Sequence, residues 1–169
     1  MDDFEPLEWV REFTGAPSLA HEHLQPVLHF TLVWSLFEEL TCNTNASLPR
    51  IMHAADEASP KLSAERYAPF LDFFSTRYSR QLWVFRLKKD EDRDHVNRVL
   101  TEGASDDVHL VKALLKLAHR VRNNLFHGEK SVIGLPAKGE LLGTATHLLA
   151  TFLEDHRAAT TPRRPRTSA

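Results

Sequence analysis

Cysteine, glycine and long apolar runs are all scarce in this 169-residue chain, and each shortage excludes a class of protein. The single cysteine, Cys42, excludes an internal disulfide and any multi-cysteine zinc site, and it is typical of a reducing compartment. The six glycines and the short β-branched runs favour an all-α fold. No apolar run approaches the roughly 20 residues that a membrane-spanning helix needs. We therefore expect a soluble protein of the cytoplasm without membrane association.

Sequence motifs for cofactors and metals are also missing. The chain has no glycine-rich phosphate loop, no dinucleotide-binding glycine pattern and no nucleophile elbow. The densest histidine cluster, His21-Glu22-His23, would place its two rings about 200° apart on a helix, and no further ligand follows at a motif spacing. We therefore expect no cofactor and no metal site.

Charge is distributed unevenly along the chain, although the net charge is only −2. Residues 157–169 contain four arginines and no acid, which leaves 17 basic and 23 acidic residues, a net charge of −6, in the remainder. An acidic body disfavours a general nucleic-acid coat, because non-specific binding needs many phosphate contacts, but it permits a local basic cleft. The composition predicts one helical domain over residues 1–157 and a disordered basic tail over residues 158–169.

Helical spacing of apolar residues recurs along most of the domain. The expected helices cover residues 5–13, 26–41, 47–58, 63–78, 92–100, 106–126 and 139–157. The last but one is the longest, and Ser105 is its expected N-cap because two acids follow in the first turn. Residues 81–87 are the only candidate strand, and they are short enough to continue a helix instead.

The segment 26–41 is the second clear helix, and Pro26 suits its first turn. It carries two apolar stripes, so we expect it to be buried on much of its circumference. The second stripe consists of Leu28, Leu32 and Leu36. Glu38 and Glu39 lie near the C-terminal end, where the helix dipole disfavours negative charge. Either both face water, or one points inward and pairs with a cation such as Arg122.

The stretch from Arg122 to His127 is the part of the sequence that folding alone explains least. It combines a cation, two amides (Asn123 and Asn124) and an imidazole at the end of the longest expected helix. Arginine is always charged and forks onto phosphate oxygens, and histidine can move a proton near neutral pH. The stretch therefore suits the handling of a phosphate. The structural alternative is that Arg122 caps helix carbonyls, the asparagines end the helix and His127 is a satisfied ring.

The spacing of Arg122 and His127 restricts how they can act together. Five residues separate them, which places them about 140° apart around an ideal helix. They can meet one phosphate only if the helix ends near residue 126 and turns, or if two chains each contribute one motif. A two-fold dimer provides the second arrangement, because both motifs can converge on its axis.

The same stretch resembles the R-polar-x-x-x-H motif of HEPN domains, with Asn123 at the polar position. The resemblance implies an all-α, up-and-down helical bundle with additional short helices, which forms a homodimer through the motif helices. In catalytic members it implies metal-independent endoribonuclease activity, and many members act as toxins, in phage defence or in RNA processing. Other members bind nucleotides or proteins without cutting, which is the alternative function here.

The resemblance also assigns roles to individual residues. Arg122 would hold the scissile phosphate and stabilise its transition state, and Asn123 would position the substrate. His127 would transfer a proton or orient the phosphate. Supporting or substrate-binding roles fall to Asn124, Lys130 and Glu38, where Glu38 matches an acidic residue of the early helix in such domains. The implied partners are RNA, a second copy of the chain, and an antitoxin or other regulatory protein.

Overall fold

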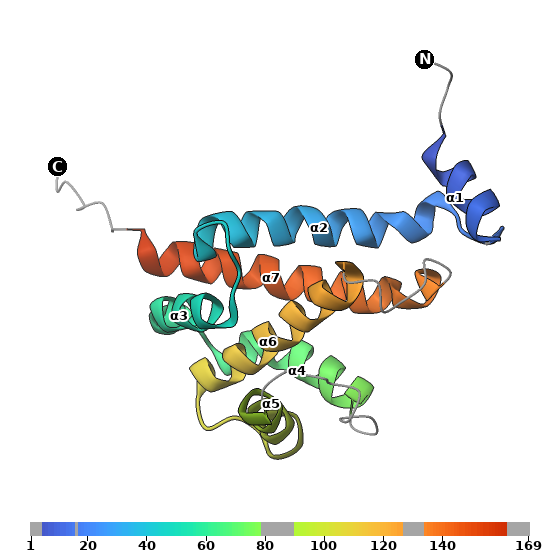
Figure 1. The fold of residues 1–169 in the computed structure, drawn as a ribbon. Helices are drawn as coiled ribbons and strands as arrows, with labels where there is room; N and C mark the ends of the chain where they lie inside the picture. The colour runs from blue at the N-terminus through green and yellow to red at the C-terminus, as the bar shows by residue number, and fades with distance from the viewer. Residues whose placement is uncertain (1–4, 16, 79–89, 127–133, 162–169) are drawn as a thin grey trace.

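The computed structural model describes residues 5–15, 17–78, 90–126 and 134–161, which form α-helices and short 3₁₀ helices without a strand (Figure 1). The elements are α1 (Pro6–Thr14), α2 (His21–Cys42), α3 (Leu48–Ala58), η1 (Ser59–Lys61), α4 (Ala64–Tyr78), α5 (Asp90–Glu102), α6 (Asp107–Phe126), η4 (Pro136–Lys138) and α7 (Gly139–Thr160). The all-α prediction is confirmed for these residues. The HEPN type of the bundle stays a prediction, and the candidate strand at 81–87 lies outside the described residues.

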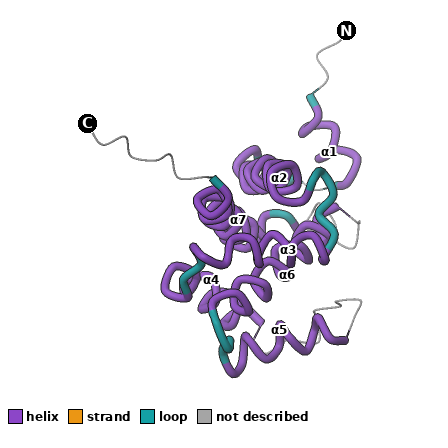
Figure 2. The backbone as a smooth tube through the Cα atoms, turned by 90° about the vertical axis from the view of Figure 1, so that its left-hand side faces the viewer, coloured by secondary structure: helices purple, strands orange, loops and turns teal. Residues whose placement is uncertain are grey.

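The α2–α7 pair forms the top layer of the bundle, and it is the most extensive helix contact in the described chain. Figure 1 shows the two helices side by side, and the view in Figure 2 places α6 beneath them and α5 at the far edge. Phe37 of α2 packs edge-on against Phe152 of α7, with ring centroids 5.9 Å apart, and both side chains are fully buried. No described helix is long and apolar enough to cross a membrane.

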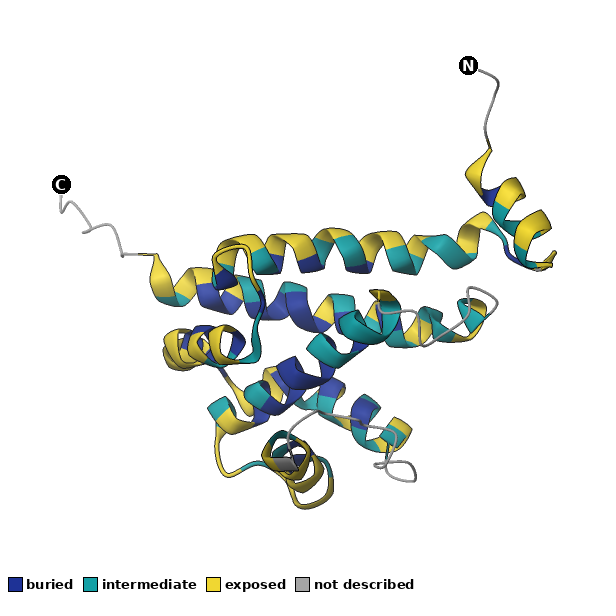
Figure 3. Ribbon diagram, viewed as in Figure 1, coloured by how far each residue is buried: buried dark blue, intermediate teal, exposed yellow. Residues whose placement is uncertain are grey.

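Helix α6 runs through the centre of the molecule. Its middle is buried on nearly every side, which Figure 3 shows as a continuous dark band. Its first turn is capped by Asp106, whose Oδ1 accepts a 2.8 Å hydrogen bond from the His109 backbone N–H. The predicted cap, Ser105, donates instead to the Asp106 carboxylate. The prediction was wrong by one residue because a carboxylate is as good an N-cap as a hydroxyl.

Helix α2 begins at His21, five residues before its predicted start at Pro26. The backbone N–H of Ala20 donates to Nδ1 of His23 at 3.0 Å, which satisfies a donor at the new helix end. Pro26 therefore lies inside the helix, where it removes one backbone hydrogen bond. The predicted start was wrong because the sequence does not show how many helical residues precede the proline.

The outer face of α2 is exposed, contrary to the expectation that this helix is buried on most of its circumference. Leu28, Leu32, Leu36 and Leu40 are 50%, 56%, 48% and 61% exposed. The reason is geometric: α2 lies at the edge of the bundle, so α7 and α3 cover only its inner face (Figures 1 and 3).

The C-terminal helix α7 ends at Thr160, three residues beyond the predicted end at Arg157. Thr160 and Thr161 still make helix-end hydrogen bonds, from the Thr160 hydroxyl to the His156 carbonyl and from the Thr161 N–H to the Arg157 carbonyl. The rest of the predicted tail lies outside the described residues.

Candidate functional site

Arg122 lies in the last two turns of α6, packed against an aromatic ring of α2. Its guanidinium carbon is 5.9 Å from the centroid of the Trp34 ring and 5.5 Å from that of Phe126. Trp34 is buried, whereas Phe126 is 51% exposed. An arginine held between aromatic faces keeps its charge and is restricted in its rotamers. The site therefore presents a guanidinium of fixed position at the end of a rigid helix.

The charge of Arg122 is not neutralised by a carboxylate anywhere in the described part of the chain. One terminal nitrogen, Nη1, donates to the Asn123 side-chain oxygen at 3.2 Å. Nε is buried and has no hydrogen-bond partner. Among the described residues the arginine thus bonds a neighbouring amide, and no hydrogen bond to a helix carbonyl is present. A buried unpaired donor costs free energy.

His119 joins this cluster from one turn earlier on α6. Its ring centroid lies 6.0 Å from that of Trp34, and its Nδ1 is 3.5 Å from Nδ2 of Asn123. Burial lowers the pKa of His119, and the positive charge of Arg122 lowers it further. The ring is therefore held neutral near Arg122, as a base and not as an acid.

Glu38 points inward from α2 but does not pair with Arg122. Its Oε1 accepts a hydrogen bond from the Ala46 backbone N–H at 3.2 Å, which fixes the chain between α2 and α3. Its negative charge reaches His119, where it opposes the lowering of the pKa. Glu39 faces solvent. One of the two acids thus points inward, but its partner is a backbone amide and its charge acts on a histidine instead of on Arg122.

The structure describes only part of the predicted motif. Asn123 and Asn124 are half-buried in the last turn of α6, beside Arg122. His127 and Lys130 lie outside the described residues, so their predicted roles stay predictions. The described part of α6 runs to Phe126, and the predicted turn after it lies outside the described residues.

Sequence reasoning missed three residues of this cluster: His119, Trp34 and Phe126. Two of them share a helix face with Arg122, because His119 precedes it by three positions and Phe126 follows it by four. That spacing was available in the sequence. The contribution of Trp34 was not, because it depends on how α2 crosses α6.

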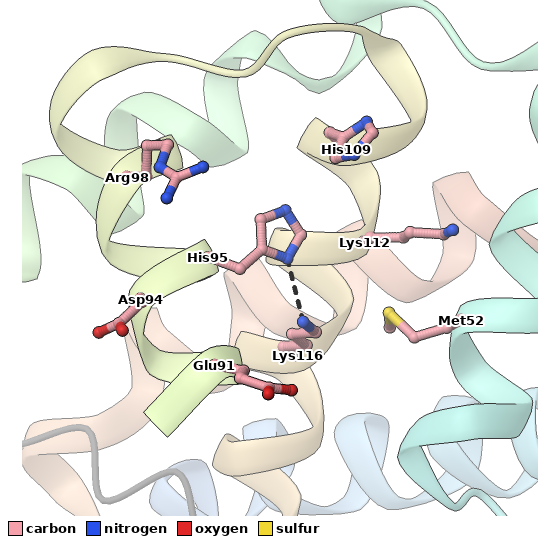
Figure 4. A pocket seen from close by; sticks show the side chains of 8 residues that line it. All are labelled: Met52, Glu91, Asp94, His95, Arg98, His109, Lys112 and Lys116. Atoms are coloured by element: carbon pink, nitrogen blue, oxygen red, sulfur yellow. Dashed lines mark hydrogen bonds between the residues drawn. The ribbon is translucent and has the colours of Figure 1, made fainter. Parts of the chain in front are cut away.

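A cavity of about 550 Å3 lies between α5, α6 and α3 (Figure 4). Its lining is rich in charged and titratable side chains: Met52, Glu91, Asp94, His95, Arg98, His109, Lys112 and Lys116. Figure 4 shows the His95 ring pointing toward Lys116, and its Nδ1 lies 3.0 Å from the ammonium. Burial lowers the pKa of His95, and the charge of Lys116 adds to this effect.

Two of the cations that line this cavity already form ion pairs with carboxylates of the fold. Lys112 contacts Asp56 at 2.6 Å, and Lys116 contacts Asp92 at 2.7 Å. Carboxylates of the fold therefore balance the charges of these two lysines, whereas no described carboxylate does so for Arg122. No group of three or more histidine, cysteine or acidic side chains is placed to hold a metal within the described ranges.

No protein-family model, no curated protein and no solved structure matches this chain. The resemblance to HEPN domains therefore depends on the motif and its helical setting.

Proposed function

We propose that the chain is a metal-independent endoribonuclease that binds the scissile phosphate of RNA at Arg122. The observation that carries the proposal is the uncompensated guanidinium of Arg122, held between two aromatic rings with a buried, unpaired Nε. A phosphate supplies the negative charge that this arginine lacks among its described contacts. Exposed Phe126 beside it can stack on an unpaired base, as aromatic side chains do in single-strand binding sites.

The proposed reaction needs no metal ion. The ribose 2′-oxygen forms a bond to phosphorus while the bond from phosphorus to the 5′-oxygen breaks, and the products are a 2′,3′-cyclic phosphate and a free 5′-hydroxyl. The 2′-hydroxyl proton goes to a base, and the leaving 5′-oxygen receives a proton. Arg122 would stabilise the extra negative charge on the phosphorane oxygens. His127 would transfer a proton or orient the phosphate.

Positioning is the second part of the proposal. The side-chain oxygen of Asn123 accepts a hydrogen bond from Arg122, and its side-chain nitrogen faces Nδ1 of His119. The side chains of one helix thus set the orientation of the guanidinium before substrate arrives, which limits the entropy lost on binding. Asn124 and Lys130 would add contacts to the substrate, and Glu38 would tune the site through His119.

A binding module that holds RNA or a nucleotide without cutting is the second candidate. One observation favours it: the only described histidine at Arg122 is His119, and its lowered pKa makes it a poor proton donor for the leaving oxygen. The described residues therefore supply phosphate binding without a general acid. The motif connects the first candidate, the ribonuclease, with a role as a toxin or in phage defence. In that role the chain would act in the cytoplasm, with an antitoxin or other regulatory protein as its partner.

The test is a cleavage assay with a mixed RNA pool in EDTA. Wild type should release products with 2′,3′-cyclic phosphate ends, and Arg122→Ala and His127→Ala should not. Arg98→Ala is the matched control, because Arg98 is an exposed arginine of α5. Each variant is checked for its melting temperature first. Equal cleavage by all variants would refute the site, and RNA binding that depends on Arg122 without cleavage would favour the binding module.

A further inference from the structure

The exposed face of α2 carries a regular seam. Five residues of α2 on this face follow one another at spacings of four, three, four and three, which is the spacing of seam positions in a coiled coil. They are Gln25, His29, Leu32, Leu36 and Glu39, and all five are exposed. On an ideal helix this seam lies about 180° from Trp34, which packs into the core. The fold therefore leaves this face of α2, with Leu32 and Leu36 at its centre, without a partner among the described residues.

The seam is symmetric about the point opposite Trp34. Leu32 and Leu36 lie at equal distances on either side of this point. The same is true of His29 and Glu39. In an antiparallel pair of α2 helices, each member of such a couple faces the other one across the axis. Leucine would meet leucine, and histidine would meet carboxylate.

We propose that two copies of the chain associate through this seam, with α2 antiparallel to α2 of the second copy. Leu32 and Leu36 of both copies form the centre of the contact. A His29–Glu39 pair closes it on each side. The geometry is that of ridges packed at about 20°, as in coiled coils and four-helix bundles. A two-fold axis requires such self-complementarity of one surface patch.

A parallel pairing of the two α2 helices does not place His29 opposite Glu39. It would set Glu39 against Glu39 and His29 against His29 of the second copy, which brings like groups together. Opposite charges across a seam select the partner and its orientation. The polar residues of α2 therefore favour the antiparallel arrangement and a second copy of this chain as the occupant.

The size of the surface predicts a weak dimer. The seam from Gln25 to Glu39 is about 21 Å long, and one helix face of that length buries less than the ~800 Å2 per partner of a standard interface. Leu28 and Leu40 flank the centre and add apolar area. Association should therefore depend strongly on protein concentration.

This dimer goes beyond the proposed function and differs from a dimer through the motif helices. The middle of α6 is buried in its own bundle, so only its two ends are accessible. Arg122 contacts Trp34 on the inner side of α2, whereas the seam lies on the outer side. Two helix thicknesses, about 20 Å or more, would separate the two Arg122 sites. Each copy would then hold its own phosphate site.

The first experiment is sedimentation equilibrium of the full chain over a wide concentration range. The double variant Leu32→Glu, Leu36→Glu should weaken dimerisation at least tenfold, because it buries four carboxylates at the centre. Both leucines are about half exposed, so the monomer should keep its helical circular dichroism. Phe126→Glu is the matched control on α6, which should leave the dimer unchanged.

The second experiment is a charge exchange. His29→Glu places carboxylates opposite Glu39 and should weaken the dimer at least fivefold, and adding Glu39→Lys should restore it. The two positions are about 15 Å apart along one helix, so rescue requires contact between copies. A monomer at all concentrations, a dimer lost only with Phe126→Glu, or no rescue would each overturn the proposal. RNA cleavage is read separately, so its absence would not bear on the dimer.

Discussion

Arg66 and Arg122 both lie at contacts between helices, but they differ in the groups that surround the guanidinium. Arg66 of α4 contacts two carboxylates of α7: Nη1 donates to Asp155 at 2.5 Å, and Nη2 bonds Glu154. Arg122 of α6 contacts two aromatic rings and an amide, with no carboxylate among the described residues. Two carboxylates of the fold balance the charge of Arg66, whereas no described carboxylate balances the charge of Arg122. The difference separates a structural cation from one available to a ligand.

The surroundings of the two arginines agree with this division. Asp155 is 3% exposed and accepts a second hydrogen bond from the Tyr67 hydroxyl at 2.9 Å. Burial and the bond to Asp155 raise the pKa of Tyr67, so its hydroxyl stays a donor. This buried network is satisfied and joins α4 to α7. At Arg122 a buried donor remains unpaired.

The largest effect that we predict is on activity. Arg122→Ala should lower RNA cleavage by about 10³-fold, about 4 kcal/mol of transition-state stabilisation, because it removes the group that faces the developing charge. The free energy of unfolding should fall by less than about 1 kcal/mol. Single-turnover cleavage and urea unfolding of the same samples measure both. Parallel losses of stability and activity would make Arg122 a structural residue like Arg66.

The next effect is on stability. Asp155→Ala should lower the free energy of unfolding by about 3 kcal/mol, because it leaves the Tyr67 hydroxyl and the Arg66 guanidinium without their buried acceptor. Urea unfolding measures the change. RNA cleavage per folded molecule should stay at the wild-type level. Lost cleavage in the folded fraction would contradict the division between the two arginines.

A smaller effect tests the same network at its edge. Tyr67→Phe removes one hydroxyl and should cost about 1 kcal/mol, because the Asp155 carboxylate keeps Arg66 as a partner. Thermal unfolding followed by circular dichroism resolves a change of this size. A loss as large as that of Asp155→Ala would mean that Arg66 contributes nothing to the network.

The smallest effect is a pH dependence at the Arg122 end. The pKa of His119 is lowered in the fold, so the unfolded chain binds its proton more readily. Stability from this group is complete above the unfolded value of about 6.5 and is lost as the pH falls toward the folded pKa. His119→Gln should flatten the unfolding free energy in that window. His95, whose pKa is also lowered, should account for part of the remaining slope. An unchanged slope would contradict the neutral state of His119.

The sequence predicted the helices well and their environment less well. Periodicity located α3, α4 and α6 because each buries one face whose residues recur at the helical repeat. It misjudged α2, because a pattern of leucines does not tell which face another helix covers. The leucines that we expected in the core form the exposed face instead.

The candidate site was likewise predictable in part. Arg122 and Asn123 stood out because polar residues followed a strongly apolar helix. For Glu38 and Glu39 the sequence left open whether one points inward, and the bond of Glu38 to Ala46 could not be read from it. The contact between Trp34 and Arg122 joins residues far apart in the chain, so it required the packing of α2 on α6.

The most direct test of the central claim is the salt dependence of RNA binding. Affinity for a short single-stranded RNA is measured at several salt concentrations for wild type, Arg122→Met and the control Arg98→Met. If Arg122 contacts a phosphate, Arg122→Met should reduce the slope of log affinity against log salt by about 0.7, the value for one phosphate of a single strand. The control should keep the wild-type slope. An unchanged slope for Arg122→Met would show that the guanidinium does not hold a phosphate and would contradict the account.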